Sequence, residues 1–237
     1  MTEVTYHYLA LSIVVILPLL GVGIGQGKIS KATMDAIKRQ PAAYDALYRL
    51  SVVALSLNET AALLSILTAL FMVTNGILSP FSWLGEFGIA AAVGLTAFVV
   101  GIGSSLPACQ SLYSAARQPF AIAHIMTLML IGQSFIQTPV IFGFIVSFLM
   151  RNQLSLATTW PEGIRLFAAG ISLGIGALGP TWGLSRFAQA ACYSLGVNKT
   201  LYYKIRTFTF LSQALIEAPI IFSLLVSLIL ATTSTNG

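Results

Sequence analysis

Long apolar stretches alternate with short polar ones along the chain. Six of these stretches contain about 20 or more predominantly apolar residues, which is the length that an α-helix needs to cross ~30 Å of hydrocarbon. The strands of a membrane β-barrel would be shorter and would alternate apolar with polar residues, whereas residues 140–149 are predominantly apolar throughout. The pattern therefore predicts an all-α membrane protein with six transmembrane helices at 8–27, 51–76, 83–106, 124–149, 164–186 and 207–231.

Composition supports this prediction and excludes several classes of function. Of the 237 residues, 57% are hydrophobic and 8% are charged, whereas about 25% are charged in an ordinary soluble domain. A soluble enzyme is therefore excluded, and basic loops explain the net charge of +5 better than nucleic-acid binding does. Cys109 and Cys192 lack metal-ligand spacing, so we expect small packing thiols and no cofactor. His7 and His124 lie near span ends without catalytic partners, and we expect interfacial roles for both.

The distribution of basic residues predicts the orientation in the membrane. Of the twelve basic residues, only Arg151 and Arg165 lie on one side of the predicted spans. The other ten fall in the loops after the first, third and fifth spans. By the positive-inside rule these three loops face the cytoplasm, and both termini face out.

An internal repeat relates the spans, with a period near 78 residues, or one pair of helices. Its anchors are a Gly-Ile-Gly motif and a polar mid-span position. These anchors are 36 residues apart in the first two repeats and 43 apart in the third, which predicts a third loop about two helical turns longer. We predict three tandem helical hairpins at 1–80, 81–152 and 153–237, with anchors at Gly23, Gly101 and Gly174 and at Glu59, Gln137 and Glu217.

The first two hairpins share a tripeptide in their cytoplasmic loops, Arg39-Gln40-Pro41 and Arg117-Gln118-Pro119. Its third counterpart is either Ala190-Ala191-Cys192 or lies elsewhere in the longer loop. A tight turn explains the proline, which cannot continue a helix. Because a turn does not require the arginine, repetition of the whole tripeptide favours a docking surface.

Small residues are concentrated in the first helix of each hairpin and bulky residues in the second. Gly21 with Gly25, and Gly23 with Gly27, form the small-xxx-small pattern that lets helices approach closely in lipid. We therefore predict a tightly packed inner layer surrounded by an outer layer. A dinucleotide-binding loop is excluded because no strand precedes these glycines.

Glu59 and Glu217 lie in the middle of apolar spans, where an unpaired charge is costly and indicates a functional site. The alternative is a permanently protonated side chain that hydrogen-bonds neighbouring helices. The shared repeat position favours function, and so does Gln137, which can hydrogen-bond but never ionise.

Distances along the hairpin give the carboxyl groups candidate neighbours. Gln26 and Glu59 stand ~21 and ~24 Å from the loop tip at 1.5 Å per residue, and are therefore level with each other. Thr60 adds a hydroxyl beside Glu59, so a small-cation or proton site is plausible. The same calculation of height along the hairpin places Ser104 level with Gln137, and the alignment of the repeats places Ala177 level with Glu217.

The segment GVGIGQGKISKATMDAIKRQP, followed by the mid-helix pair Glu59-Thr60, resembles the c subunit (proteolipid) of F-type rotary ATP synthases. The whole chain resembles three such hairpins fused in tandem. The resemblance implies a two-layered homo-oligomeric rotor ring in contact with lipids, a stator a subunit and central-stalk subunits. It also implies a bacterial inner membrane or another energy-coupling membrane. Translocation of H⁺ or Na⁺ would be coupled to ATP synthesis, without ATP-hydrolysing residues on this chain.

The resemblance also implies roles for individual residues. Glu59 and Glu217 would carry ions, with Gln26 and Thr60 helping Glu59 to coordinate Na⁺, although Leu64 stands where sodium-driven members usually have tyrosine. The remaining implied roles are a degenerate ion position at Gln137 and Ser104 and a central-stalk contact at Arg39, Gln40, Pro41, Arg117, Gln118 and Pro119.

Three alternatives remain open. A V- or A-type proteolipid of an ATP-driven pump is favoured by the fusion and the missing carboxyl group, and disfavoured by the Arg-Gln-Pro loops. A stand-alone six-helix transporter would also have internal repeats and intramembrane acids, but a glycine-rich inner face makes a poor central cavity. A purely structural bundle would use both glutamates only as hydrogen-bonding groups.

Overall fold

The computed structural model describes residues 2–75 and 79–233, and within these residues all regular structure is helical. Three-residue 3₁₀ turns join the two helices of each hairpin, at Pro41–Ala43, Pro119–Ala121 and Lys199–Leu201, and a fourth follows α4 at Leu154–Leu156. The α-helices are α1 (Thr2–Arg39), α2 (Tyr44–Asn75), α3 (Ser82–Arg117), α4 (Ile122–Gln153), α5 (Trp160–Gly176), α6 (Leu178–Val197) and α7 (Tyr202–Thr232).

The described residues form six rods that are long and apolar enough to cross a membrane, as the hydrophobic pattern predicts. The predicted end of the second span, residue 76, lies outside the described residues. The rods are longer than the predicted spans, and the 38 residues of α1 measure ~57 Å, against ~30 Å of hydrocarbon. The helices therefore extend well beyond the hydrocarbon layer.

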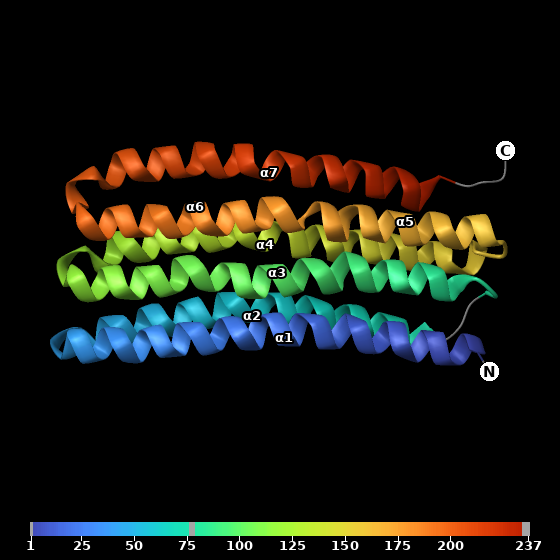
Figure 1. Cartoon of the computed structure of the whole chain (residues 1–237), viewed down its shortest axis with the longest axis horizontal. Helices are drawn as coiled ribbons and strands as arrows, with labels where there is room; N and C mark the ends of the chain where they lie inside the picture. The colour runs from blue at the N-terminus through green and yellow to red at the C-terminus, as the bar shows by residue number, and fades with distance from the viewer. Residues whose placement is uncertain (1, 76–78, 234–237) are drawn as a thin grey trace.

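Helices α5 and α6 form one rod with a local break at Ala177 (Figure 1). Backbone hydrogen bonds continue across the break, from Ala177 N to the Leu173 carbonyl at 2.9 Å and from Thr181 N to the Ala177 carbonyl at 3.0 Å. Pro180 has no N–H group, so the Gly176 carbonyl loses its usual helical partner. Proline therefore accounts for the break.

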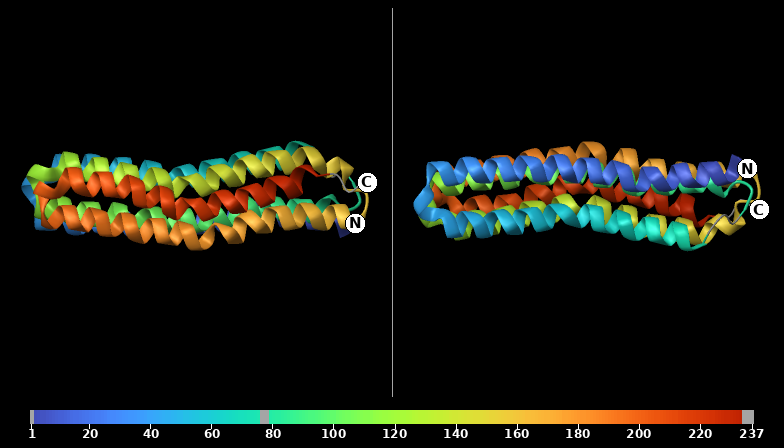
Figure 2. Two further views of the ribbon diagram at one scale, coloured as in Figure 1. Left: turned by 90° about the horizontal axis from the view of Figure 1, so that it is seen from above. Right: turned by 90° about the horizontal axis from the view of Figure 1, so that it is seen from below.

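The rods pack in two layers, and the hairpins follow one another in chain order from α1 and α2 at one edge to α7 at the other (Figures 1 and 2). One layer, here called the glycine layer, consists of α1, α3 and the α5–α6 rod. The outer layer consists of α2, α4 and α7. Both termini lie at one end of the bundle and the three hairpin tips at the other (Figure 2).

Glycines set the close spacing of the glycine layer. A Cβ added to Gly101 of α3 would lie 2.5 Å from the Val22 nitrogen and 2.6 Å from the Gly21 carbonyl carbon of α1. A Cβ at Gly25 would likewise collide with the backbone of Gly101. This contact confirms the prediction of tightly packed first helices, because only residues without a side chain allow such an approach.

The third hairpin corrects the prediction of a longer loop. Its tip is the same three-residue 3₁₀ turn as in the other hairpins, and 18 residues separate the start of each turn from the carboxyl position. The extra residues lie before the tip, within the α5–α6 rod, so Gly174 is two turns farther from the tip than Gly23 and Gly101 are. The counterpart of Arg-Gln-Pro is therefore Val197-Asn198-Lys199, not Ala190-Ala191-Cys192.

Candidate functional site

Neighbouring hairpins contact each other through residues that lie one repeat apart. The Gln133 amide donates to the Ala54 carbonyl at 3.4 Å across the first boundary, and Ser114 donates to the Cys192 carbonyl at 3.0 Å across the second. These pairs are separated by 79 and 78 residues. Both boundaries therefore bring together residues about one repeat apart in the sequence.

A neutral polar cluster fills the boundary between hairpin 1 (α1 and α2) and hairpin 2 (α3 and α4). The Asn58 amide donates to the Val22 carbonyl at 3.2 Å, and the Ser104 hydroxyl donates to the Asn58 side-chain oxygen. Gln133 donates to the Ser104 carbonyl at 3.2 Å. Asn58, Ser104 and Gln133 are completely buried, so the cluster fixes the relative height of the two hairpins at mid-membrane.

Gln137 occupies the carboxyl position of hairpin 2 and lies against the outer helix of hairpin 1. Its amide donates to the Leu57 carbonyl at 2.7 Å, and its side chain is 7% exposed. Thr60 donates to the same carbonyl at 2.8 Å and lines an open groove together with Gln137. The rest of the groove is apolar apart from Ser134, and it is lined by Leu57, Leu63, Leu64 and Ile141.

Glu217 has the equivalent arrangement one hairpin later. It is half-buried on α7, and its carboxyl group interacts with the side chain of Thr138 on α4. Pro139 and Pro219 lie inside α4 and α7, two residues after Gln137 and Glu217. Because proline has no N–H group, the carbonyls four residues before each proline, Phe135 and Leu215, lack their usual helical donors.

Glu59 differs because no outer helix among the described residues covers it. Its side chain is exposed on α2, on the side that in hairpin 2 faces the preceding outer helix. Gln26 is half-buried on α1. The hydrogen bond between Asn58 and Val22 shows that Gln26 lies near the height of Glu59. Among the described residues, however, no hydrogen bond joins Gln26 to Glu59. Thr60, expected beside Glu59, lines the groove with Gln137 instead.

The predicted pairing of Ala177 with Glu217 is wrong. Because the third tip is a short turn, the residue level with Glu217 is Leu184, at the same distance from the tip as Gln26 and Ser104. Leucine provides no polar group for the carboxyl. The out-of-register Gly174 motif is the cause of this error.

The Arg-Gln-Pro tripeptides form the first two hairpin tips, and each also contacts the next hairpin. The Arg39 guanidinium lies over the Tyr113 ring at 5.4 Å, and Arg117 lies over Tyr193 at 5.1 Å. The Gln118 amide donates to the Val197 carbonyl at 3.1 Å. Both arginines remain exposed, so they can stack on a neighbouring hairpin and still face a partner.

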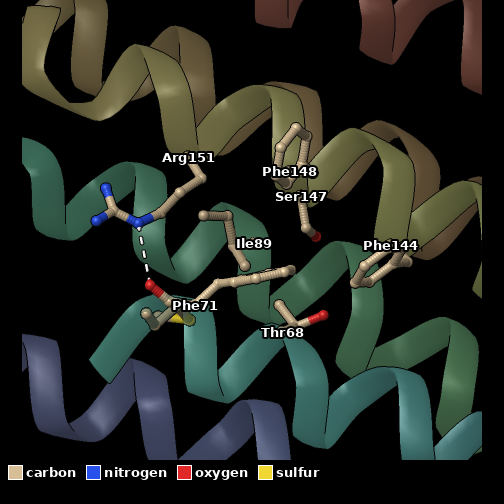
Figure 3. Close-up of a pocket in the computed structure, with 8 residues that line it drawn as sticks. Thr68, Phe71, Ile89, Phe144, Ser147, Phe148 and Arg151 are labelled. Carbon is tan, nitrogen blue, oxygen red and sulfur yellow. Dashed lines mark hydrogen bonds between the residues drawn. The ribbon is translucent and has the colours of Figure 1, made fainter. Parts of the chain in front are cut away.

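A buried polar cluster near the ends opposite the tips is absent from the sequence-based predictions. His7 Nδ1 lies 2.8 Å from Glu86 Oε1, and the two residues are 6% and 2% exposed, so the prediction that His7 is interfacial is wrong. Arg151 is electrostatically coupled to Glu86, and its Nε donates to the Phe71 carbonyl at 3.4 Å (Figure 3). The cavity drawn there, about 10 Å³, holds at most one water molecule. His7 and Glu86 are separated by 79 residues, about one repeat, so a search of the sequence for titratable residues one repeat apart would have found this pair.

Comparison with known proteins agrees with the three-hairpin architecture. The sequence profile of the ATP synthase C subunit matches residues 9–72, 87–150 and 167–230. The ATP synthase c subunit of Bacillus thuringiensis (strain Al Hakam) is 33% identical over 70 residues, which cover 30% of this chain and 97% of that relative. The ATP synthase c subunit of Bacillus anthracis (strain CDC 684 / NRRL 3495) matches with the same identity and coverage. The chain therefore belongs to the ATP synthase C-subunit family, as three tandem copies of its hairpin.

Proposed function

We propose that the chain is the rotor-ring proteolipid of an F-type rotary ATP synthase and carries H⁺ or Na⁺ on Glu59 and Glu217. The observation that carries the proposal is the carboxyl position itself, which occurs once per hairpin in the middle of the outer helix and, in hairpins 2 and 3, lies against the outer helix of the preceding hairpin. A carboxyl group crosses the hydrophobic sector only when a proton or cation neutralises it. A ring of such groups turns when each is loaded from one side of the membrane and unloaded to the other.

The surroundings of Glu217 suit reversible ion binding. The Thr138 hydroxyl interacts with the Glu217 carboxyl, and the Phe135 carbonyl, whose usual helical donor is replaced by Pro139, lies on the same stretch of α4. Its counterpart, the Leu57 carbonyl, accepts the hydrogen bond from Gln137. A protonated Glu217 has an acceptor of this kind for its proton, and a bound Na⁺ would find carboxylate, hydroxyl and carbonyl oxygens, which hard cations prefer.

The two edges of the chain support assembly into a ring of identical copies. A Cβ at Gly23, Gly27 or Gly179 would meet no atom within 4 Å, although these glycines lie in otherwise close-packed helices. Gly23 of hairpin 1 is equivalent to Gly101 of hairpin 2, and Gly101 contacts Gly21 and Val22 of the preceding hairpin. The position of Gly21 is occupied in hairpin 3 by Gly179. The α1 edge of one copy therefore matches the α6–α7 edge of another head to tail, which is the type of interface that forms a ring when the rotation between successive copies closes.

The proposed partners follow from the two ends and the outer layer. The hairpin tips with Arg39 and Arg117 face the cytoplasm and the central stalk, and the termini face out. The exposed bulky side chains of α2 and α7 contact lipid and the stator a subunit, whose positive charge would meet Glu59 and Glu217 in turn. Among these exposed side chains are Leu63, Leu70, Leu215, Phe222 and Ile229.

Gln137 favours a second candidate, an ATP-driven ion pump of the V or A type. With one carboxyl group replaced in every three hairpins, fewer ions cross per turn, and each ATP moves fewer ions against a larger gradient. Each elementary charge moved through the full membrane potential requires ~2.3 kcal/mol per 100 mV. A count of ions per ATP tests this consequence, because it should fall below the count for a ring in which every hairpin carries an ion.

Carbodiimide labelling of the purified ring across pH, with and without Na⁺, tests the proposal. Mass spectrometry assigns the label to individual glutamates. We expect Glu59 and Glu217 to react, and protection by Na⁺ at fixed pH identifies Na⁺ as the coupling ion, whereas indifference to Na⁺ identifies H⁺. Labelling of Glu3 and Glu162 without labelling of Glu59 and Glu217 would mean that the two mid-membrane carboxyls are sealed structural groups.

A further inference from the structure

The side chain that faces each carboxyl position comes from the hairpin before it. Gln137 lies beside Thr60 in the groove, and the Glu217 carboxyl interacts with the Thr138 side chain in the same way one hairpin later. Thr60 and Thr138 are themselves equivalent, each one residue after a carboxyl position. We call this the hydroxyl position. In the third hairpin it is occupied by Ala218, which has no hydroxyl group.

The pairing leaves Glu59 without a neighbouring outer helix among the residues that the structure describes. Gln137 and Glu217 each have an outer helix of a preceding hairpin beside them, whereas Glu59 is exposed at the free edge of α2. In a ring of identical chains, the outer helix that covers this edge is α7 of a second copy. The residue placed beside Glu59 is then Ala218 of the second copy, where Glu217 has Thr138.

Resting on the proposed rotor function, we infer that the two ion-carrying glutamates are chemically different sites. Glu217 forms a site within one chain that includes a hydroxyl group from Thr138. Glu59 forms a site between two chains, completed by the methyl group of Ala218 of the second copy. Thr138 is thus a positioning and specificity-determining residue for one site only, and every turn of the ring presents two kinds of carboxyl group to the stator.

The inner helices add to the difference. Ser104 of hairpin 2 hydrogen-bonds Asn58 on the preceding outer helix. The equivalent residue is Gln26 in hairpin 1 and Leu184 in hairpin 3. An amide therefore lies on the inner helix level with Glu59, whereas Glu217 has an alkyl side chain at that height. The Glu59 site takes its polar support from its own hairpin, and the Glu217 site from the hairpin before it.

Site-resolved carbodiimide labelling of assembled rings tests this inference with matched variants. The reagent attacks a protonated carboxyl, and a hydroxyl hydrogen bond favours the ionised form. One such hydrogen bond changes the labelling rate by roughly fivefold. Thr138→Val should accelerate labelling of Glu217 by that factor and leave Glu59 unchanged. Ala218→Thr should slow labelling of Glu59 and leave Glu217, its sequence neighbour, unchanged.

Thr60→Val is the control, because Thr60 lies beside Gln137. It should change the labelling of neither glutamate. Folding is not expected to limit these variants, because the hydroxyl position already accepts threonine in two hairpins. The inference is overturned if Ala218→Thr leaves Glu59 unaffected in the intact ring, or if Thr60→Val alters Glu59. Equal labelling of both glutamates, insensitive to Thr138→Val, would refute their difference and leave the proposed function intact, whereas no labelling of either would refute both.

Discussion

Replacing Gly101 with alanine is expected to destabilise the chain, whereas the same replacement at Gly23 is not. The two glycines occupy equivalent positions in hairpins 2 and 1. Gly101 contacts the backbone of α1, but a Cβ at Gly23 would meet no atom within 4 Å. The pair therefore separates packing within one chain from packing between chains.

The magnitude follows from the contact distances. An alanine Cβ at position 101 would lie 2.5 Å from the Val22 nitrogen, whereas ordinary contact begins at 3.4 Å, so α1 and α3 must separate by about 1 Å. A gap of this size forfeits a quarter to a half of the dispersion energy of the atoms it separates. Overpacking of this kind costs about 1–3 kcal/mol. For a chain of this length, that lowers the melting temperature by roughly 2–12 °C.

Two measurements on each variant test this reasoning. Thermal melting of the chain dispersed as monomers in detergent, followed by circular dichroism, reports packing within the chain. Native mass spectrometry of the membrane-extracted protein reports ring assembly. We expect Gly101→Ala to melt earlier, and Gly23→Ala to melt like the unmodified chain but to assemble poorly. Equal melting of both variants, or a Gly23→Ala ring as stable as the unmodified one, would refute the head-to-tail use of these edges.

Two further substitutions probe the contacts that join hairpins 1 and 2. His7→Phe keeps a ring but leaves buried Glu86 without its 2.8 Å partner, so we expect a loss of about 3 kcal/mol or more in the free energy of unfolding. His124→Phe, which can keep the stacking on Tyr202, is the control, and equal melting of these two variants would count against the buried pair. Arg39→Ala removes the guanidinium from the Tyr113 ring and should cost about 0.5–1 kcal/mol. Arg49→Ala is the control, because among the described residues the Arg49 side chain bonds only the Asp45 carbonyl of its own helix, and it should cost less free energy of unfolding. The reverse order of melting temperatures would contradict the stacking assignment.

The hydrophobic pattern predicts the six membrane-crossing rods, because helices that cross lipid must satisfy their backbone hydrogen bonds internally and are long and apolar. The internal repeat predicts the three hairpins, and the distribution of glycines predicts the two layers. The register of hairpin 3 was not predictable from the Gly-Ile-Gly motif. Any pair of small residues can serve close packing, so Gly174 packs closely against α3 although it lies two turns farther from its hairpin tip than Gly23 does. The distance from the tip to the carboxyl position was the more reliable measure, because it is 18 residues in every hairpin.

The sequence also does not show which neighbouring helix each polar side chain faces. Thr60 follows Glu59 in sequence, and adjacency made it a natural candidate for the same site. Successive residues on a helix face different directions, and the structure places Thr60 in the groove beside Gln137. A sequence with three repeats states which residues are equivalent, but only packing shows which hairpin each one faces.

The most direct test of the rotor assignment is ATP-driven ion transport by the whole complex in sealed membrane vesicles. Glu59→Gln and Glu217→Gln each remove one ionisable group while keeping its shape, and Glu86→Gln is the matched control at a buried carboxyl outside the proposed sites. The account predicts that rings with Glu59→Gln still assemble but transport no ions, and that Glu86→Gln retains transport. Coupled transport that survives Glu59→Gln would contradict it.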